Sequence, residues 1–296
     1  MKVALVGLGR WGRRYPEILI RLGAELVVCH TRQIGDNVDW LAARHPGVRH
    51  STSLAAALDR ELDGVVIATP RQTHGALVIE CLRRDLHVLV EKPAATSVAD
   101  AQVAEAEASA RGLVLRTGYT HCHDTALRAL ADLVAGCAAP SWRLVWHKFA
   151  PGTGPSDIVW EYVPHVISIA HLLGGGVGPV ASTITREPSE TGTVEIAMGM
   201  GTAEVSTRPG IPRLKRITLF DSGGVVAEWT DRHLFDRRNN VTFKATEEPL
   251  ANQVRSFFDE IVAPNPLKSA SIPPEVATTE LLVALASTIE PSAALN

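Results

Sequence analysis

The sequence predicts an α/β protein in two parts: a doubly wound parallel sheet of the Rossmann type, then an α/β domain with an open, mainly antiparallel sheet. Three observations support this. Short apolar runs alternate with longer Ala-, Leu- and Arg-rich segments in the first part, and a G-x-G-x-x-G sequence follows the first run. After residue 120, strand-like runs are separated by Gly and Pro instead. A chain of 296 residues exceeds one ordinary core. We therefore expect domains at 1–120 and 121–296.

The first part contains five apolar runs typical of strands that are buried on both faces of a parallel sheet. They lie at 3–7, 25–30, 64–69, 86–91 and 113–119. The segments between and after them are long enough for the helices that parallel strands require as connections. We expect these helices at 13–22, 38–45, 53–59, 74–84 and 97–111.

The second part mixes helices with strands that alternate between apolar and polar residues. Helices are expected at 124–136, 161–173, 249–263 and 273–289, with a Gly/Pro-rich loop at 150–157. Strands are expected at 141–149, 180–187, 193–198, 202–207, 214–220 and 225–229. The last two helices are expected to return toward the first domain. A basic group, Arg208, Arg213, Lys215 and Arg216, fits a solvated strand edge, or alternatively a phosphate-bearing substrate.

The amino-acid composition argues against some classes of binding partner. The net charge is -3, from 29 basic and 32 acidic residues without a basic run, so nucleic acid is not an expected partner. The apolar N-terminus is interrupted by glycines too early for a signal peptide or a membrane span, and we expect a cytoplasmic protein. The 4 cysteines are dispersed without a C-x-x-C pair, which argues against a disulfide framework.

Gly7, Gly9 and Gly12 predict a dinucleotide-binding loop. Gly7 permits a tight turn, Gly9 permits close approach of a pyrophosphate, and Gly12 permits packing of the helix on the sheet. The helix N-terminus attracts the phosphates. Within the loop, Arg10 is expected at the pyrophosphate, and Trp11 either covers the nicotinamide ribose or packs internally.

The end of the second strand bears on the choice of cofactor. A site for NAD usually carries a carboxylate there for the ribose 2′-hydroxyl. This chain has Thr31 and Arg32 instead, a hydroxyl and a guanidinium that suit a 2′-phosphate. We therefore expect NADP rather than NAD. The alternative is that Arg32 stacks on adenine or faces solvent.

Four motifs together resemble the Gfo/Idh/MocA oxidoreductase family. They are VALVGLGRWG, GVVIATPRQTH, HVLVEKP and TGYTH, at 3–12, 64–74, 87–93 and 117–121. Further along, 160–165 resembles the family's helix that carries an Asp and a His four residues apart, and 249–262 resembles its C-terminal helix. Glu161 stands where Asp is usual in that helix.

The resemblance implies an NAD(P)-dependent enzyme that transfers a hydride between nicotinamide C4 and a secondary alcohol or ketone of a sugar, sugar nucleotide or cyclitol. It places Lys92 beside the reacting oxygen and His165 as proton donor or acceptor, with Glu161 in support. Physical reasoning agrees, since an ammonium stabilises an alkoxide and an imidazole transfers protons near neutral pH. The alternatives are reduction of an imine or conjugated acceptor, and a non-catalytic NADP sensor.

Other positions follow from the same resemblance. Cofactor contacts are implied for Thr69, Pro70, His74, Glu91 and Lys92, although His74 has a packing role as its alternative. Substrate contacts are expected from Lys92, Glu161 and His165, and also from Tyr119, His121 and Trp160. No metal site is expected: His121 and His123 would share one face of a strand, but further ligands are missing. The expected partners are a small-molecule substrate and further copies of the chain, through the C-terminal sheet, without a membrane.

Overall fold

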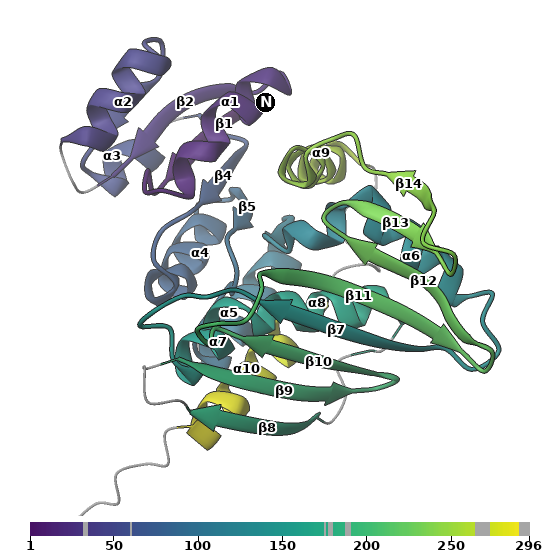
Figure 1. Cartoon of the computed structure of the whole chain (residues 1–296). Helices are drawn as coiled ribbons and strands as arrows, with labels where there is room; N and C mark the ends of the chain where they lie inside the picture. The colour runs from purple at the N-terminus through teal and green to yellow at the C-terminus, as the bar shows by residue number, and fades with distance from the viewer. Residues whose placement is uncertain are drawn as a thin grey trace, which may run out of the picture. The chain divides into compact units, whose positions relative to one another are not determined.

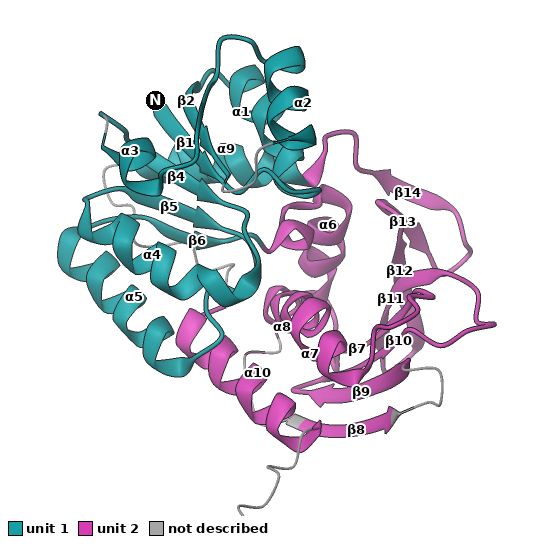
Figure 2. Cartoon of the chain, turned by 90° about the vertical axis from the view of Figure 1, so that its left-hand side faces the viewer, with its two compact units in different colours: residues 1–118, 250–269 teal, residues 119–249, 270–296 magenta. Residues whose placement is uncertain are grey.

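The structure is a computed structural model that describes residues 1–31, 35–59, 61–174, 176, 180–186, 191–263 and 273–289. The chain forms two compact units, and each contains one sheet (Figure 2). Unit 1 comprises Met1–Gly118 and Leu250–Ser269. Unit 2 comprises Tyr119–Pro249 and Ala270–Asn296.

Unit 1 is built on a six-stranded sheet in the order β3-β2-β1-β4-β5-β6, and all its strand pairs are parallel (Figure 1). The strands are β1 Lys2–Val6, β2 Glu25–His30, β3 Arg49–Ser51, β4 Gly64–Ile67, β5 His87–Val90 and β6 Leu115–Thr117. The chain winds outward from β1 in one direction and from β4 in the other, so the predicted doubly wound fold is confirmed. Only the short edge strand β3 was not expected, because RHS has no apolar run.

Helices cover both faces of this sheet. They are α1 Tyr15–Arg21, α2 Asp36–Arg44, α3 Leu54–Leu58, α4 His74–Arg83, α5 Val98–Arg111 and α9 Pro249–Val262. Ser97 caps α5 as expected, since its hydroxyl accepts a 3.1 Å hydrogen bond from the Asp100 N–H. On one face α9 buries Leu250, Val254 and Phe257 in the same core as α1. The core of the other face contains residues of α4 and α5.

Unit 2 is built on an eight-stranded sheet in the order β14-β13-β12-β11-β7-β10-β9-β8. Its pairs are antiparallel except for β7 with β10, which confirms the expected mainly antiparallel sheet. The strands are β7 Ser141–His147, β8 Val180–Arg186, β9 Gly192–Met198, β10 Gly201–Ser206, β11 Leu214–Asp221, β12 Gly224–Thr230, β13 His233–Asp236 and β14 Val241–Lys244. The sequence did not predict β13 and β14. They are short, and β14 is exposed along its whole length, so it has no burial pattern to detect.

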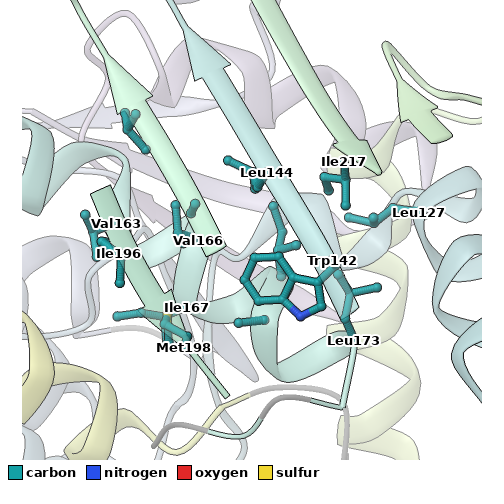
Figure 3. Packing of buried hydrophobic residues seen from close by; sticks show 14 of the residues in the cluster. Leu127, Trp142, Leu144, Val163, Val166, Ile167, Leu173, Ile196, Met198 and Ile217 are labelled. Atoms are coloured by element: carbon teal, nitrogen blue, oxygen red, sulfur yellow. The ribbon is translucent and has the colours of Figure 1, made fainter. Parts of the chain in front are cut away.

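Helices pack on one face of the unit 2 sheet: α6 Thr125–Val134, α7 Pro155–Glu161, α8 Val163–Leu172 and α10 Glu275–Ile289. The expected loop at 150–157 is wrong in its second half, because α7 begins at Pro155, a residue that the first helical turn tolerates. Figure 3 shows Trp142 and Leu144 of β7 packed with Ile217 of β11 and residues of α8. Among the described residues, no helix combines the length and apolarity that a membrane crossing requires.

Candidate active site

The glycine loop has the shape that a dinucleotide requires. Gly7 has a φ of +103°, and a Cβ there would lie 2.4 Å from the carbonyl oxygen of Ala68. A Cβ on Gly12 would lie 2.1 Å from the carbonyl oxygen of Gly7. By contrast, a Cβ on Gly9 would meet nothing within 4 Å. The first and third glycines are therefore required by packing, whereas the second leaves room for an approaching ligand.

This loop lies at the point where the strand order reverses. It follows β1, and β1 pairs with β4, whose carboxyl end leads into Thr69 and Pro70. Open parallel sheets bind ligands at this point, beyond the carboxyl ends of the strands. Thr69 is half-buried and Pro70 is exposed, while Arg10 and Trp11 are exposed in the loop. The structure thus brings four of the expected cofactor contacts to one edge.

His74 is buried and does not belong to that group of exposed residues. Its Nδ1 lies 2.7 Å from the carbonyl oxygen of Pro93, and its Nε2 lies 2.8 Å from that of Thr69. Since both neighbours are acceptors, only the imidazolium can donate to both at once. His74 thus ties the end of β4 to the turn after β5, which corresponds to its packing alternative, and its cofactor contact stays a prediction.

Glu91 is also occupied by protein groups. Its buried carboxylate accepts hydrogen bonds from the Tyr15 hydroxyl, at 2.5 Å, and from the indole N–H of Trp11. Burial raises the pKa of Glu91, although these donors oppose the shift. The pKa of Tyr15 is well above its ordinary value because of burial and the adjacent Glu91 charge. These contacts let the carboxylate of Glu91 hold the glycine loop in place, and its contact with the cofactor stays a prediction.

Trp11 packs within the glycine loop, in agreement with one of its two expected roles. The hydrogen bond to Glu91 fixes its indole nitrogen, and the guanidinium of Arg14 lies 4.4 Å from the ring centroid. The side chain nevertheless remains 41% exposed. Trp11 therefore packs within the loop and keeps an exposed surface at the edge where the dinucleotide is expected.

Lys92 follows β5, the strand next to β4, and is half-buried. The Lys92–Pro93 peptide bond is cis. Thr31 lies at the corresponding end of β2, and its N–H donates a 3.1 Å hydrogen bond to the carbonyl oxygen of Ser51. Arg32 lies outside the described residues. The glycine loop, Thr31, Thr69 and Lys92 thus all lie beyond the carboxyl ends of adjacent parallel strands.

Unit 2 carries the expected proton-transfer residues. Glu161 is the last residue of α7, and His165 lies in the first turn of α8, after Pro164. The two residues therefore belong to successive helices, and Glu161 precedes the start of α8 as the proline predicts. The rings of His165 and His121 are 4.8 Å apart in an edge-on contact. His121, expected at the substrate, is thus beside the expected proton donor.

These two histidines belong to a larger group, which we call the His121 cluster: His121, Trp146, Tyr162, His165, Lys215 and Trp229. Trp146 lies 5.3 Å from both His121 and Tyr162 and 5.8 Å from His165, measured between ring centroids. The Lys215 ammonium lies 3.3 Å from His121 Nε2. All the members except Trp229 are half-buried, so polar and aromatic groups are together at an accessible position.

Lys215 has different surroundings from those expected for the basic group. It was expected on a solvated edge, but β11 lies between β7 and β12, inside the sheet. Burial lowers the pKa of Lys215 to about 8. The sequence indicates this position, because residues two apart on a strand share a face and Lys215 alternates with the apolar Ile217 and Leu219.

Two expected substrate contacts have other surroundings. Tyr119 is fully buried, and its hydroxyl donates a 3.2 Å hydrogen bond to Glu275 of α10. Tyr119 thus takes part in the packing of unit 2, and its substrate contact stays a prediction. Trp160 is half-buried against the unit 2 core. His121 and His123 lie in a 3₁₀ turn instead of a strand, and no group of three possible metal ligands occurs in the described ranges.

The six-stranded parallel sheet and its glycine loop define a dinucleotide-binding Rossmann domain. Residues 1–119 match the family model GFO_IDH_MocA, described as an oxidoreductase family with an NAD-binding Rossmann fold. This match covers 119 of the 296 residues and agrees with the resemblance of the motifs to the Gfo/Idh/MocA oxidoreductase family.

Two curated relatives match part of the chain. A 4-carboxy-2-hydroxymuconate-6-semialdehyde dehydrogenase from Sphingobium sp. is 36% identical over 191 residues, which are 60% of this chain and 60% of that protein. An inositol 2-dehydrogenase from Mycolicibacterium vanbaalenii is 33% identical over 137 residues, 45% of this chain and 40% of that protein. The matches thus span less than two thirds of the length of either relative.

The fold matches a solved structure over nearly its whole length. The structure of UDP-N-acetylglucosamine 3-dehydrogenase from Acidithiobacillus ferrooxidans has a TM-score of 0.78. The match covers 96% of this chain and 95% of that one, with 22% identity. At this identity, the similarity shows a shared fold and not a shared substrate.

Proposed function

We propose that the protein is an NAD(P)-dependent oxidoreductase that transfers a hydride between nicotinamide C4 and a secondary alcohol or ketone of a sugar, sugar nucleotide or cyclitol. The observation that carries this proposal is the glycine loop, whose second glycine leaves an open approach at the edge that also bears Lys92. The relatives named inositol 2-dehydrogenase and UDP-N-acetylglucosamine 3-dehydrogenase support the substrate class.

The residues of the loop suit the cofactor. Backbone N–H groups after Gly7, together with the start of the first helix, suit a pyrophosphate. When bound, the nicotinamide supplies or accepts the hydride. The residues after β2 are Thr31 and Arg32, and neither has a carboxylate. We therefore propose NADP as the preferred cofactor. A guanidinium matches the geometry of a 2′-phosphate, whereas a carboxylate would repel it.

The proposal assigns polar roles to Lys92, His165 and Glu161. Lys92 stabilises negative charge on the reacting oxygen, because an oriented ammonium interacts more strongly with an alkoxide than with an alcohol or a ketone. His165 holds or moves the proton at that oxygen, since imidazole transfers protons near neutral pH. Glu161 supports His165.

The test is a turnover assay. Purified protein is mixed with NADP⁺ or NAD⁺ and a panel of cyclitols, free sugars and nucleotide sugars, and formation of the reduced nicotinamide is followed by absorbance. Lys92→Met should lower kcat by about 100- to 1000-fold, while the Kd of the dinucleotide, measured by calorimetry, changes far less. Lys148→Met, at an exposed position, is the matched control.

Two outcomes would refute the proposal. One is that no member of the panel is oxidised or, in the reverse assay with ketones, reduced. The other is that Lys92→Met retains normal kcat, which would favour a dinucleotide sensor, because a sensor needs the glycine loop but does not need this ammonium.

Assembly is proposed as well. One face of the unit 2 sheet carries the helices, and the polar side chains of the other face form ion pairs such as Arg216 with Glu228, at 3.2 Å. We propose that this second face joins copies of the chain, which light scattering after size-exclusion chromatography would test. The cytoplasmic location stays a prediction from the sequence.

A further inference from the structure

Lys215 occupies a position where the pattern of the sheet calls for an apolar residue. On β11 it shares a face with Ile217 and Leu219, which are both fully buried. Across the strand pair it lies directly opposite Trp146 of β7. Burying an ammonium on such a face costs free energy that a leucine would not. A structural role alone does not account for a charge at this point.

The surroundings of Lys215 stabilise a cation without neutralising it. Its Nζ lies 4.7 Å from the ring centroid of Trp146 and 5.4 Å from that of Trp229, the geometry of cation–π contacts. It also donates a 3.3 Å hydrogen bond to His121 Nε2. Within the described part of unit 2, no carboxylate forms an ion pair with it. Asp231 and Asp124 act on it only as more distant charges.

The protonation of the pair follows from its geometry. An ammonium can only donate hydrogen bonds, so the facing Nε2 of His121 must accept and that imidazole is neutral while Lys215 is charged. The pKa of Lys215 is about 8, so the ammonium is mainly charged at neutral pH. The His121–Lys215 pair therefore carries one positive charge. The ring of His121 also contacts the ring of His165, so this charge lies close to His165.

We propose that Lys215 binds a carboxylate of the substrate, so that the substrate class is an acidic sugar or a related hydroxy acid. One ammonium beside a neutral imidazole matches the single negative charge of a carboxylate, whereas a phosphate would bring up to two charges. The indole of Trp146, half-buried in the same cluster, suits the apolar face of a sugar ring. The inference rests on the proposed function, because it takes His165 as the group at the reacting carbon.

The test compares matched acidic and neutral ligands. Binding of D-glucuronate, D-galacturonate and D-gluconate is measured by calorimetry with NADP⁺ present, beside D-glucose, D-galactose and D-glucose 6-phosphate. At least one acid should bind about 10-fold or more tightly than its neutral partner, and Lys215→Met should remove that difference, because a charge-assisted hydrogen bond is lost. Affinity for NADP⁺ should not change.

Arg216→Met is the matched control, since Arg216 is the next residue on the same strand but points to the opposite face, where it pairs with Glu228. A measurement on the unaltered protein makes the test independent of folding of the variant. The affinity for the acid should fall as the pH is raised through about 8, because Lys215 loses its charge there while the ligand carboxylate keeps its own.

The inference is overturned if no acid is preferred over its neutral partner, if the sugar phosphate is preferred over the acids, or if Lys215→Met keeps the preference. The proposed function fails separately. An acid that binds through Lys215 without any hydride transfer would contradict the enzyme assignment and leave the carboxylate site intact. Oxidation of neutral sugars without a preference for acids would support the enzyme assignment and contradict the carboxylate site.

Discussion

The hydroxyl of Tyr15 lies 2.5 Å from the carboxylate of Glu91, which joins the first helix of unit 1 to the turn that carries Lys92. The side-chain amide of Gln253 on α9 donates a 3.3 Å hydrogen bond to the same hydroxyl. The indole N–H of Trp11 reaches Glu91 from the glycine loop. Segments far apart in the sequence are thus connected through one buried carboxylate, and this connection positions the loop relative to the Lys92 turn.

Tyr15→Phe should destabilise unit 1. The substitution keeps the ring but removes a donor from the buried Glu91, which should lower the free energy of unfolding by about 1–3 kcal/mol. Chemical denaturation of the variant and the wild type measures the change. Tyr162→Phe, at a half-buried position in unit 2, is the control and should change stability less. Equal stability of Tyr15→Phe and wild type would contradict this account.

Gly9→Ala should separate cofactor binding from folding. The new methyl group meets no protein atom within 4 Å, so the melting temperature should stay unchanged. It would nevertheless occupy the approach of the pyrophosphate, and the Kd for NADP⁺ should rise about 10-fold or more. Gly47→Ala, equally unobstructed but in a different turn, should change neither quantity. Normal NADP⁺ affinity in Gly9→Ala would argue against dinucleotide binding at this loop.

Arg32→Ser should alter the choice of cofactor. If Arg32 contacts the 2′-phosphate, its removal should weaken NADP⁺ about 10- to 100-fold and leave NAD⁺ nearly unaffected. Parallel calorimetric titrations with the two dinucleotides provide the comparison. Arg49→Ser, an exposed position at the start of β3, is the control. An equal loss for both dinucleotides would mean that Arg32 stacks on the adenine, and the preference for NADP would be wrong.

Lys215→Met should raise the free energy of unfolding at neutral pH, and this gain should disappear at alkaline pH. The pKa of Lys215 is lowered from 10.5 to about 8, mainly by burial. Between these values the unfolded chain retains a proton that the folded chain has released, so the stability of the wild type rises with pH. Below about pH 8 the buried ammonium should cost about 1–2 kcal/mol relative to methionine.

Denaturant unfolding at about pH 7 and about pH 10 tests this expectation. The charged groups that act on Lys215 are Asp231, Asp124 and Arg213, in addition to the contact with His121. Lys244→Met, at an exposed position on β14, should give a curve parallel to that of the wild type. If the free energies of unfolding of Lys215→Met and wild type differed by the same amount at both pH values, Lys215 would not titrate in this range.

The parts of the fold that sequence patterns predicted share a local cause. Buried parallel strands such as β4 and β5 need continuous apolar runs, and these are visible without knowledge of their neighbours. Strands β13 and β14 were not predicted because both are short, and β14, at the edge of the sheet, is exposed along its whole length. Helix α7 escaped because its first turn, Pro155 included, has the composition of a loop.

The sequence by itself determined the resemblance to the Gfo/Idh/MocA family, the Rossmann sheet, the glycine loop and the position of Lys92, because each depends on residues close together along the chain. Only the tertiary structure decided that Glu91 and His74 are engaged by protein groups, and that Lys215 meets His121, 94 residues away. Such contacts depend on which strands become neighbours and which face each side chain takes. Both are set by the packing of the whole unit and not by any local pattern.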